Sequence, residues 1–157
     1  MKTKPLLSDY LIMFSDYPDV MSTKMLCEIL NHVSRKLGYR LMSSGAIRSI
    51  KIGREYKTTK LWVLEYLTGE VFSVSDYYKY MFINYPDMVG AKLVETMLDN
   101  ISSRLVYNLI QTGKIKSRRI GREYKVAKLW IFEYLTNEIL TNEVQNIQEM
   151  NNSDNNQ

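Results

Sequence analysis

The chain has 157 residues, of which 45% are hydrophobic and 24% charged, and a formal net charge of +4. This composition is typical of a globular protein, and no stretch approaches the roughly 20 apolar residues of a membrane span. Residues 1–5 lack the apolar run of a signal peptide, and the single cysteine, Cys27, excludes an internal disulfide. Both observations favour a cytoplasmic location.

The chain contains one sequence twice. Residues 17–70 align without a gap to residues 85–138, and about half of the positions are identical. Two copies of this length indicate a duplicated small domain rather than a solenoid, which needs at least three units. We therefore predict a first module over residues 1–70, a second over residues 71–140, and a disordered tail over residues 141–157, which is rich in Asn and Gln. Such small modules are expected to support each other's cores.

Each copy is preceded by a predicted helix, over residues 6–14 and 75–83. Tyr-Pro-Asp then breaks the chain at residues 17–19 and 85–87, because proline disfavours helix in the residue before it. Ser22 is a suitable N-cap for a helix that continues to Leu30, and Gly90 occupies the same position in the second copy. The lone Cys27 lies on the apolar face of this helix and is expected to pack in the core.

A second helix is predicted to begin after Ser34 or Ser102 and to end at Gly45 or Gly113, since glycine adopts the left-handed conformation that ends helices. Its apolar positions are expected to face the core: Leu37, Leu41 and Met42, or Leu105, Val106, Leu109 and Ile110. The opposite face carries polar, basic and tyrosine side chains: Arg35, Lys36, Tyr39, Arg40 and Ser43, or Ser103, Arg104, Tyr107, Asn108 and Gln111.

Alternating residues over 47–52 and the Gly53-Arg54 pair predict a two-stranded hairpin, which we call the wing. A third helix over residues 60–67 is expected to close the core with Leu61, Trp62, Leu64 and Leu67. The order helix, turn, helix, basic hairpin, helix is that of a winged helix-turn-helix. The predicted fold class is therefore mainly α with small β wings, in two tandem winged helix-turn-helix modules.

The positive charge is concentrated at equivalent places in the two copies. Residues 34–57 hold seven basic residues and one acidic residue, and residues 102–125 hold the same numbers. The remainder of the chain is acidic. Two repeated basic surfaces favour a polyanion as the partner.

The second helix and wing resemble those of the excisionase-type helix-turn-helix family of phages and conjugative elements. The resemblance covers both repeats and is carried by Ser34, Tyr39, Arg40, Gly45, Ile52-Gly53-Arg54 and Tyr56-Lys57, with Ser102, Tyr107, Gly113, Ile120-Gly121-Arg122 and Tyr124-Lys125 in the second copy. It implies that the second helix enters the major groove and that the wing contacts the DNA backbone or the minor groove. It implies no catalysis, no cofactor and no metal, and a bacterial or phage-encoded protein associated with the nucleoid. Members bend DNA, direct recombinases or regulate transcription.

The chain departs from the family pattern at three points. Gly38 lies in the middle of a helix where the second copy has Val106, at a cost on the order of 1 kcal/mol in helix propensity; it predicts either a looser helix or a close backbone approach. Leu37 and Leu105 occupy a position that is often threonine in the family. Two modules in one chain are also not the family's usual arrangement.

The wing motif is identical in both copies, whereas the outward helix face differs. Phosphate contacts carry no sequence information, but base contacts do. We therefore expect the wings to hold the DNA backbone and the helices to read different half-sites, with guanine preferred by the first and adenine by the second. The predicted wing contacts are basic residues: Lys51, Arg54, Lys57, Arg119, Arg122 and Lys125.

The plainer interpretation is that these side chains are solvated surface, but the recurrence of the same basic windows argues against it. Catalysis lacks support, because nucleophilic and metal chemistry need convergent His, Cys or carboxylate groups and the chain has one His and one Cys. The expected partner is double-stranded DNA, with a recombinase or a second copy of the chain as possible companions, and no membrane or small-molecule ligand. An excisionase-like accessory factor, a transcriptional regulator and a protein-interaction adaptor that uses the basic face remain as alternatives.

Overall fold

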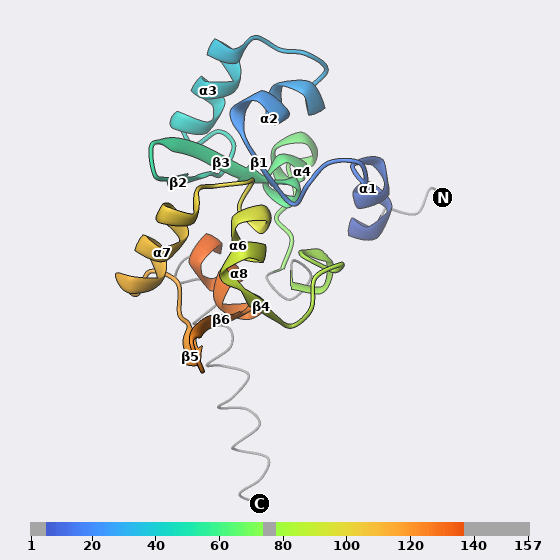
Figure 1. Cartoon of the computed structure of the whole chain (residues 1–157). Helices are drawn as coiled ribbons and strands as arrows, with labels where there is room; N and C mark the ends of the chain where they lie inside the picture. The colour runs from blue at the N-terminus through green and yellow to red at the C-terminus, as the bar shows by residue number, and fades with distance from the viewer. Residues whose placement is uncertain (1–5, 74–77, 137–157) are drawn as a thin grey trace, which may run out of the picture.

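The computed structural model of the chain describes residues 6–73 and 78–136 (Figure 1). The elements of its first module are α1 (Leu7–Met13), β1 (Val20–Met21), α2 (Thr23–Ile29), α3 (Arg35–Ser43), β2 (Ile50–Ile52), β3 (Glu55–Thr59) and α4 (Lys60–Thr68). The predicted second module repeats the order from β1 onward, with β4 (Met88–Gly90), α6 (Ala91–Met97), α7 (Ser103–Gln111), β5 (Arg118–Ile120), β6 (Glu123–Ala127) and α8 (Lys128–Thr136). The predicted class, mainly helical with small sheets, is confirmed.

Two predicted segments lie partly or wholly outside the described residues. Of the leading helix predicted over residues 75–83, residues 78–80 are helical and a turn follows, while residues 74–77 are not described. The predicted tail also lies outside the described residues. Within the described part of the chain, no helix has the length and apolarity to cross a bilayer.

Side-chain caps and glycines set the helix ends as predicted. The Ser22 hydroxyl accepts a hydrogen bond from Met25 N at 3.3 Å, and the Ser34 and Ser102 hydroxyls accept from Leu37 N and Leu105 N, each at 3.2 Å. Gly45 and Gly113 follow α3 and α7 with φ of +83° and +77°. These caps satisfy backbone groups that a helix end leaves unpaired.

Each wing belongs to a three-stranded antiparallel sheet, in the orders β1-β3-β2 and β4-β6-β5. Ile52 pairs with Glu55 and Ile120 with Glu123, so that a two-residue Gly-Arg turn closes each hairpin. The sequence predicts the hairpins but not β1 and β4, which are too short to show strand alternation. They pair with the far ends of β3 and β6, as in the Val20 to Thr59 register.

The core differs from prediction at two leucines of the first module. Leu37 is 40% exposed and Leu67 is 51% exposed, so the prediction that they pack in the core is wrong. Met42 is buried as predicted, and the helix phase turns Gly38 and Val63 inward instead of the two leucines. Cys27 is buried as predicted, and a Cβ at Gly38 would lie 2.5 Å from its Sγ. Gly38 therefore allows a close approach of α3 to α2.

The modules are joined by a shared core and by polar contacts. A single cluster of buried residues includes Ile52 and Trp62 of the first module with Val106 and Phe132 of the second. Phe82 N donates a hydrogen bond to Asp19 Oδ2 at 3.1 Å. Burial raises the pKa of Asp19, although the charge of Lys60 and the Phe82 N–H group act in the opposite direction. The two predicted modules therefore share part of one hydrophobic core.

Candidate nucleic-acid interface

All ten side chains predicted on the outward helix faces are exposed. On α3 these are Arg35, Lys36, Tyr39, Arg40 and Ser43, and on α7 they are Ser103, Arg104, Tyr107, Asn108 and Gln111. The opposite face of each helix is anchored in the core, by Met42 in α3 and by Val106 and Ile110 in α7. Each helix therefore presents a polar face to the solvent, in a fixed orientation.

Tyrosine pairs connect each of these helices to its wing. Tyr39 of α3 makes an edge-to-face contact with Tyr56 of β3, with ring centroids 5.5 Å apart, and Tyr107 of α7 contacts Tyr124 of β6 at 6.1 Å. The Lys51 ammonium lies 5.6 Å from the Tyr56 ring centre, and the Arg119 guanidinium 5.8 Å from that of Tyr124. Such contacts stabilise the arrangement of both partners. Tyr56 and Tyr124, which the sequence offers only as part of the repeated motif, therefore hold each wing against its helix.

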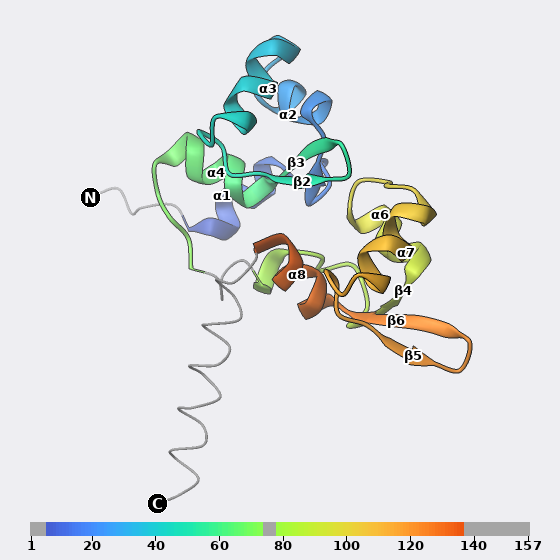
Figure 2. The same cartoon turned by 90° about the vertical axis from the view of Figure 1, so that its left-hand side faces the viewer.

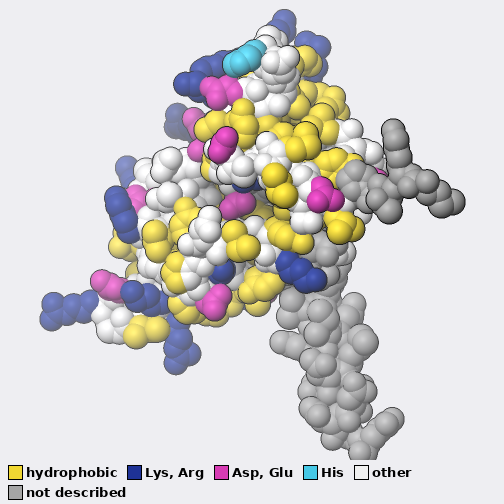
Figure 3. Space-filling model, turned by 90° about the vertical axis from the view of Figure 1, so that its right-hand side faces the viewer, with side chains coloured by type: hydrophobic (Ala, Val, Ile, Leu, Met, Phe, Trp, Pro, Cys, Tyr) yellow, Lys and Arg dark blue, Asp and Glu magenta, His cyan; other side chains and the backbone are white. Residues whose placement is uncertain are grey.

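The two helices and two wings lie on one side of the molecule. In Figure 1 α3, the β2–β3 hairpin, α7 and the β5–β6 hairpin follow one another down the left-hand side. Figure 2 faces that side and shows the same order. The opposite face in Figure 3 is mainly apolar and neutral, and most Lys and Arg side chains project from its edges.

The two wings have identical sequences but different surroundings. In the first wing Ile52 is 2% exposed, and a Cβ at Gly53 would lie 3.0 Å from Leu105 Cδ2 of α7. In the second wing Ile120 is 55% exposed, and nothing lies within 4 Å of a Cβ at Gly121. The first wing is docked on the second module, whereas no residue of the described ranges packs on the tip of the second wing.

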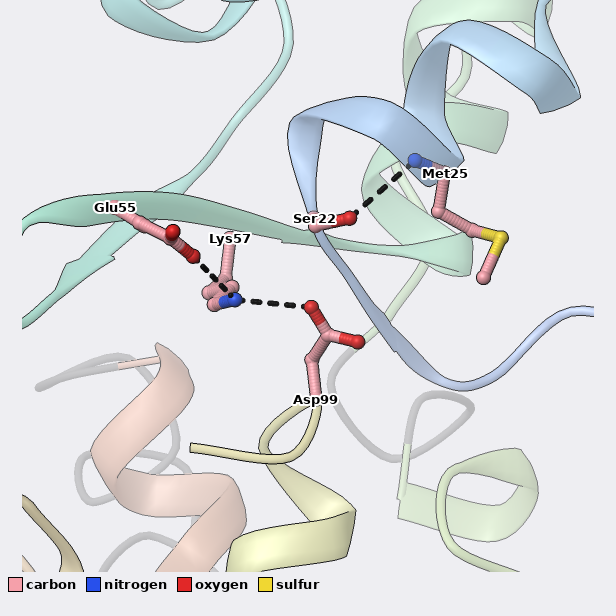
Figure 4. Close-up of polar contacts among 5 residues, drawn as sticks. All are labelled: Ser22, Met25, Glu55, Lys57 and Asp99. Atoms are coloured by element: carbon pink, nitrogen blue, oxygen red, sulfur yellow. Dashed lines mark hydrogen bonds and ion pairs between the residues drawn. The ribbon is translucent and has the colours of Figure 1, made fainter. Parts of the chain in front are cut away.

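Lys57 is a correction to the predicted site. Its side chain is 4% exposed, and its Nζ lies 2.9 Å from Asp99 Oδ2 and 3.0 Å from Glu55 Oε2 (Figure 4). Burial lowers the pKa of Lys57, but the hydrogen bonds and charges of Asp99 and Glu55 outweigh it, and the net shift is upward. The ammonium is therefore committed to the module junction and is not available to a phosphate group.

The remaining predicted wing residues are accessible. Lys51, Arg54, Arg119 and Arg122 are exposed. Lys125 is 34% exposed and pairs with Glu123 at 2.8 Å, and this hydrogen bond lowers the pKa of Glu123. Lys57 and Lys125 thus hold equivalent positions in the repeat but differ in accessibility.

The described residues contain no group of three or more His, Cys, Asp or Glu side chains able to hold a metal ion. An open cavity of about 700 Å³ lies between the modules, lined by Trp62 and Trp130 with the basic residues Arg48, Lys114 and Lys116. Lys116 and Glu133 both line this cavity and form an ion pair, with Nζ and Oε2 3.4 Å apart.

Comparisons with protein-family models, curated proteins and solved structures give no significant match.

Proposed function

We propose that the chain binds double-stranded DNA through two tandem winged helix-turn-helix modules. The observation that supports this proposal most directly is the placement of α3, α7 and both wings on one side of the molecule. A polar helix anchored from behind by its core face is suited to the major groove, which is about 12 Å wide. The exposed wing arginines are suited to phosphate groups on either side.

The faces of α3 and α7 support different half-sites. Arg35, Lys36 and Arg40 on α3 favour guanine, while Asn108 and Gln111 on α7 favour adenine. Selection of binding sites from random duplexes should therefore return an asymmetric sequence. Two indistinguishable half-sites would reject this assignment.

The role that fits best is an excisionase-like accessory factor of a mobile element, which holds two adjacent sites and bends the DNA between them. A transcriptional regulator with the same binding mode is the nearest alternative, and the neighbouring genes distinguish the two: an integrase gene favours the first, a divergent promoter the second. Both roles use the same surface.

A salt titration tests DNA binding itself. Affinity for a duplex should fall steeply as salt rises, because each phosphate contact releases counterions. Arg122→Ala should reduce the slope of log affinity against log salt by about 1. Lys79→Ala removes the same charge from an exposed residue outside both basic windows and should leave the slope unchanged.

The opposite outcome favours a protein-interaction adaptor. If the purified chain does not bind duplexes even in dilute buffer, or if the Arg122 and Lys79 variants behave alike, DNA is not the partner of this surface. An acidic protein would then be the better candidate for the basic face.

A further inference from the structure

The first wing makes a contact with the second module inside the chain. Gly53 of that wing lies against Leu105, Ile52 belongs to the core cluster that both modules share, and Lys57 pairs with Asp99. Asp99 and Leu105 belong to the α6–α7 corner, residues 98–105. We call this contact, between residues 52–57 and the α6–α7 corner, the internal joint.

The duplication supplies both halves of the joint a second time, and neither half is covered by the residues that the structure describes. The second wing repeats the sequence Ile-Gly-Arg-Glu-Tyr-Lys at residues 120–125. In the α2–α3 corner, residues 30–37, Asn31 and Leu37 occupy the positions of Asp99 and Leu105. The corners share a backbone conformation, since φ is +63° at Asn31 and +67° at Asp99.

The unused halves expose apolar side chains that are covered in the joint. Ile120 is 55% exposed where its counterpart Ile52 is 2% exposed, and Leu37 is 40% exposed where Leu105 is partly buried. The two surfaces lie at opposite ends of the molecule, with α3 and the β5–β6 hairpin at the top and bottom of Figure 1. They therefore cannot meet within one chain, but they can meet between two chains.

We propose that a second copy of the chain docks its second wing on the α2–α3 corner of the first and so repeats the internal joint between molecules. Such a contact joins unlike surfaces and leaves a free wing and a free corner at the ends, so it propagates head to tail. It also leaves the helix faces open, because Arg104 and Asn108 of α7 remain exposed beside the internal joint. The proposal does not depend on DNA binding.

Two differences make the contact between chains weaker than the internal joint. Asn31 replaces Asp99, so Lys125 meets a neutral amide instead of a carboxylate, and Arg118 stands where the first wing has the partly buried Ile50. The contact also lacks the covalent connection that raises the effective concentration of the internal joint. Association is therefore expected at high protein concentration, with monomers in dilute solution.

Sedimentation velocity on the full chain without DNA tests the proposal. The weight-average sedimentation coefficient of the wild type should rise with concentration. Asn31→Asp restores the carboxylate and should tighten association about fivefold, as expected when a charge-assisted hydrogen bond replaces a neutral one. Ile120→Asp and Leu37→Asp, at exposed positions in opposite halves of the contact, should each give monomers with an unchanged melting temperature.

Mixing the two blocked variants decides the geometry. The Ile120→Asp chain retains a free corner and the Leu37→Asp chain a free wing, so an equimolar mixture should form a 1:1 dimer and nothing larger. Failure of the mixture to dimerise would overturn the proposal, as would self-association that neither substitution reduces. A wild type and an Asn31→Asp variant that both remain monomeric at the highest attainable concentration would also overturn it.

Discussion

At the scale of single residues, the duplication provides internal controls for the effect of environment. Lys57 and Lys125 are preceded by the same five residues, and each pairs with the glutamate two residues before it. Only Lys57 also meets Asp99, from another module and 42 residues away. The difference between a buried structural lysine and an accessible one is therefore a tertiary effect, which the repeated motif alone does not reveal.

The stability of the two lysine variants should differ accordingly. Lys57→Met leaves Asp99 without its buried partner and should lower the free energy of unfolding by about 2 kcal/mol. Lys125→Met, the matched control, breaks an exposed pair and should cost less than about 0.5 kcal/mol. Urea denaturation at neutral pH measures both values, and equal losses would contradict the structural role of Lys57.

The same lysine predicts a dependence on alkaline pH. Its pKa is raised above the ordinary 10.5 in the folded chain, so its contribution is complete below 10.5 and is lost as pH rises through the folded-state value. The difference in stability between the wild type and Lys57→Met should therefore narrow above pH 10.5. The tyrosines, which also ionise in this range, are common to both proteins and cancel in the comparison.

At the scale of elements, the sequence predicts the helices and hairpins well, because Ser34, Ser102, Gly45 and Gly113 mark the helix ends locally. It also predicts the exposed faces of α3 and α7, because the 3.6-residue period of a helix is a local pattern that separates the polar side from the apolar side. It fails at Leu67, which is 51% exposed while its counterpart Leu135 is 4% exposed. Equivalent positions in the repeat differ where each module meets different neighbours, and no local pattern records that.

The packing of α3 on α2 provides an element-scale prediction. Gly38→Ala gains about 1 kcal/mol of helix propensity, but its Cβ would lie 2.5 Å from the buried Cys27 Sγ. Overpacking of this kind costs about 1–3 kcal/mol, so the variant should be less stable than the wild type. In a Cys27→Ala background the obstacle is gone, and Gly38→Ala should become neutral or stabilising.

A double-mutant cycle of unfolding free energies checks this explanation. Additive effects would show that Gly38 is required for some other reason. The second module already has a larger side chain here, Val106, and it has Glu95 in place of Cys27. Glu95 accepts a hydrogen bond from the Ser103 hydroxyl at 2.6 Å, so its carboxylate is directed to the start of α7.

At the scale of the whole molecule, the internal joint changes what two modules in one chain can do. A flexible connection would allow half-sites at variable spacing, but the shared core and the Lys57–Asp99 pair fix the modules in one arrangement. The proposed DNA-binding surface is then a single row of four elements, in the order α3, first wing, α7, second wing. A fixed row should tolerate only one half-site spacing.

This order predicts where each wing acts on DNA. The first wing lies between the two helices, so Arg54→Ala should weaken protection in the middle of a footprint and leave both ends intact. The second wing lies at the end of the row, so Arg122→Ala should shorten the footprint from the end next to the α7 half-site. Hydroxyl-radical footprinting resolves the two effects because it reports single nucleotides, and Lys79→Ala serves as the control that changes neither. If Arg54→Ala instead removes protection at the outer end beside the α3 half-site, the modules bind DNA in an arrangement other than that of the free protein.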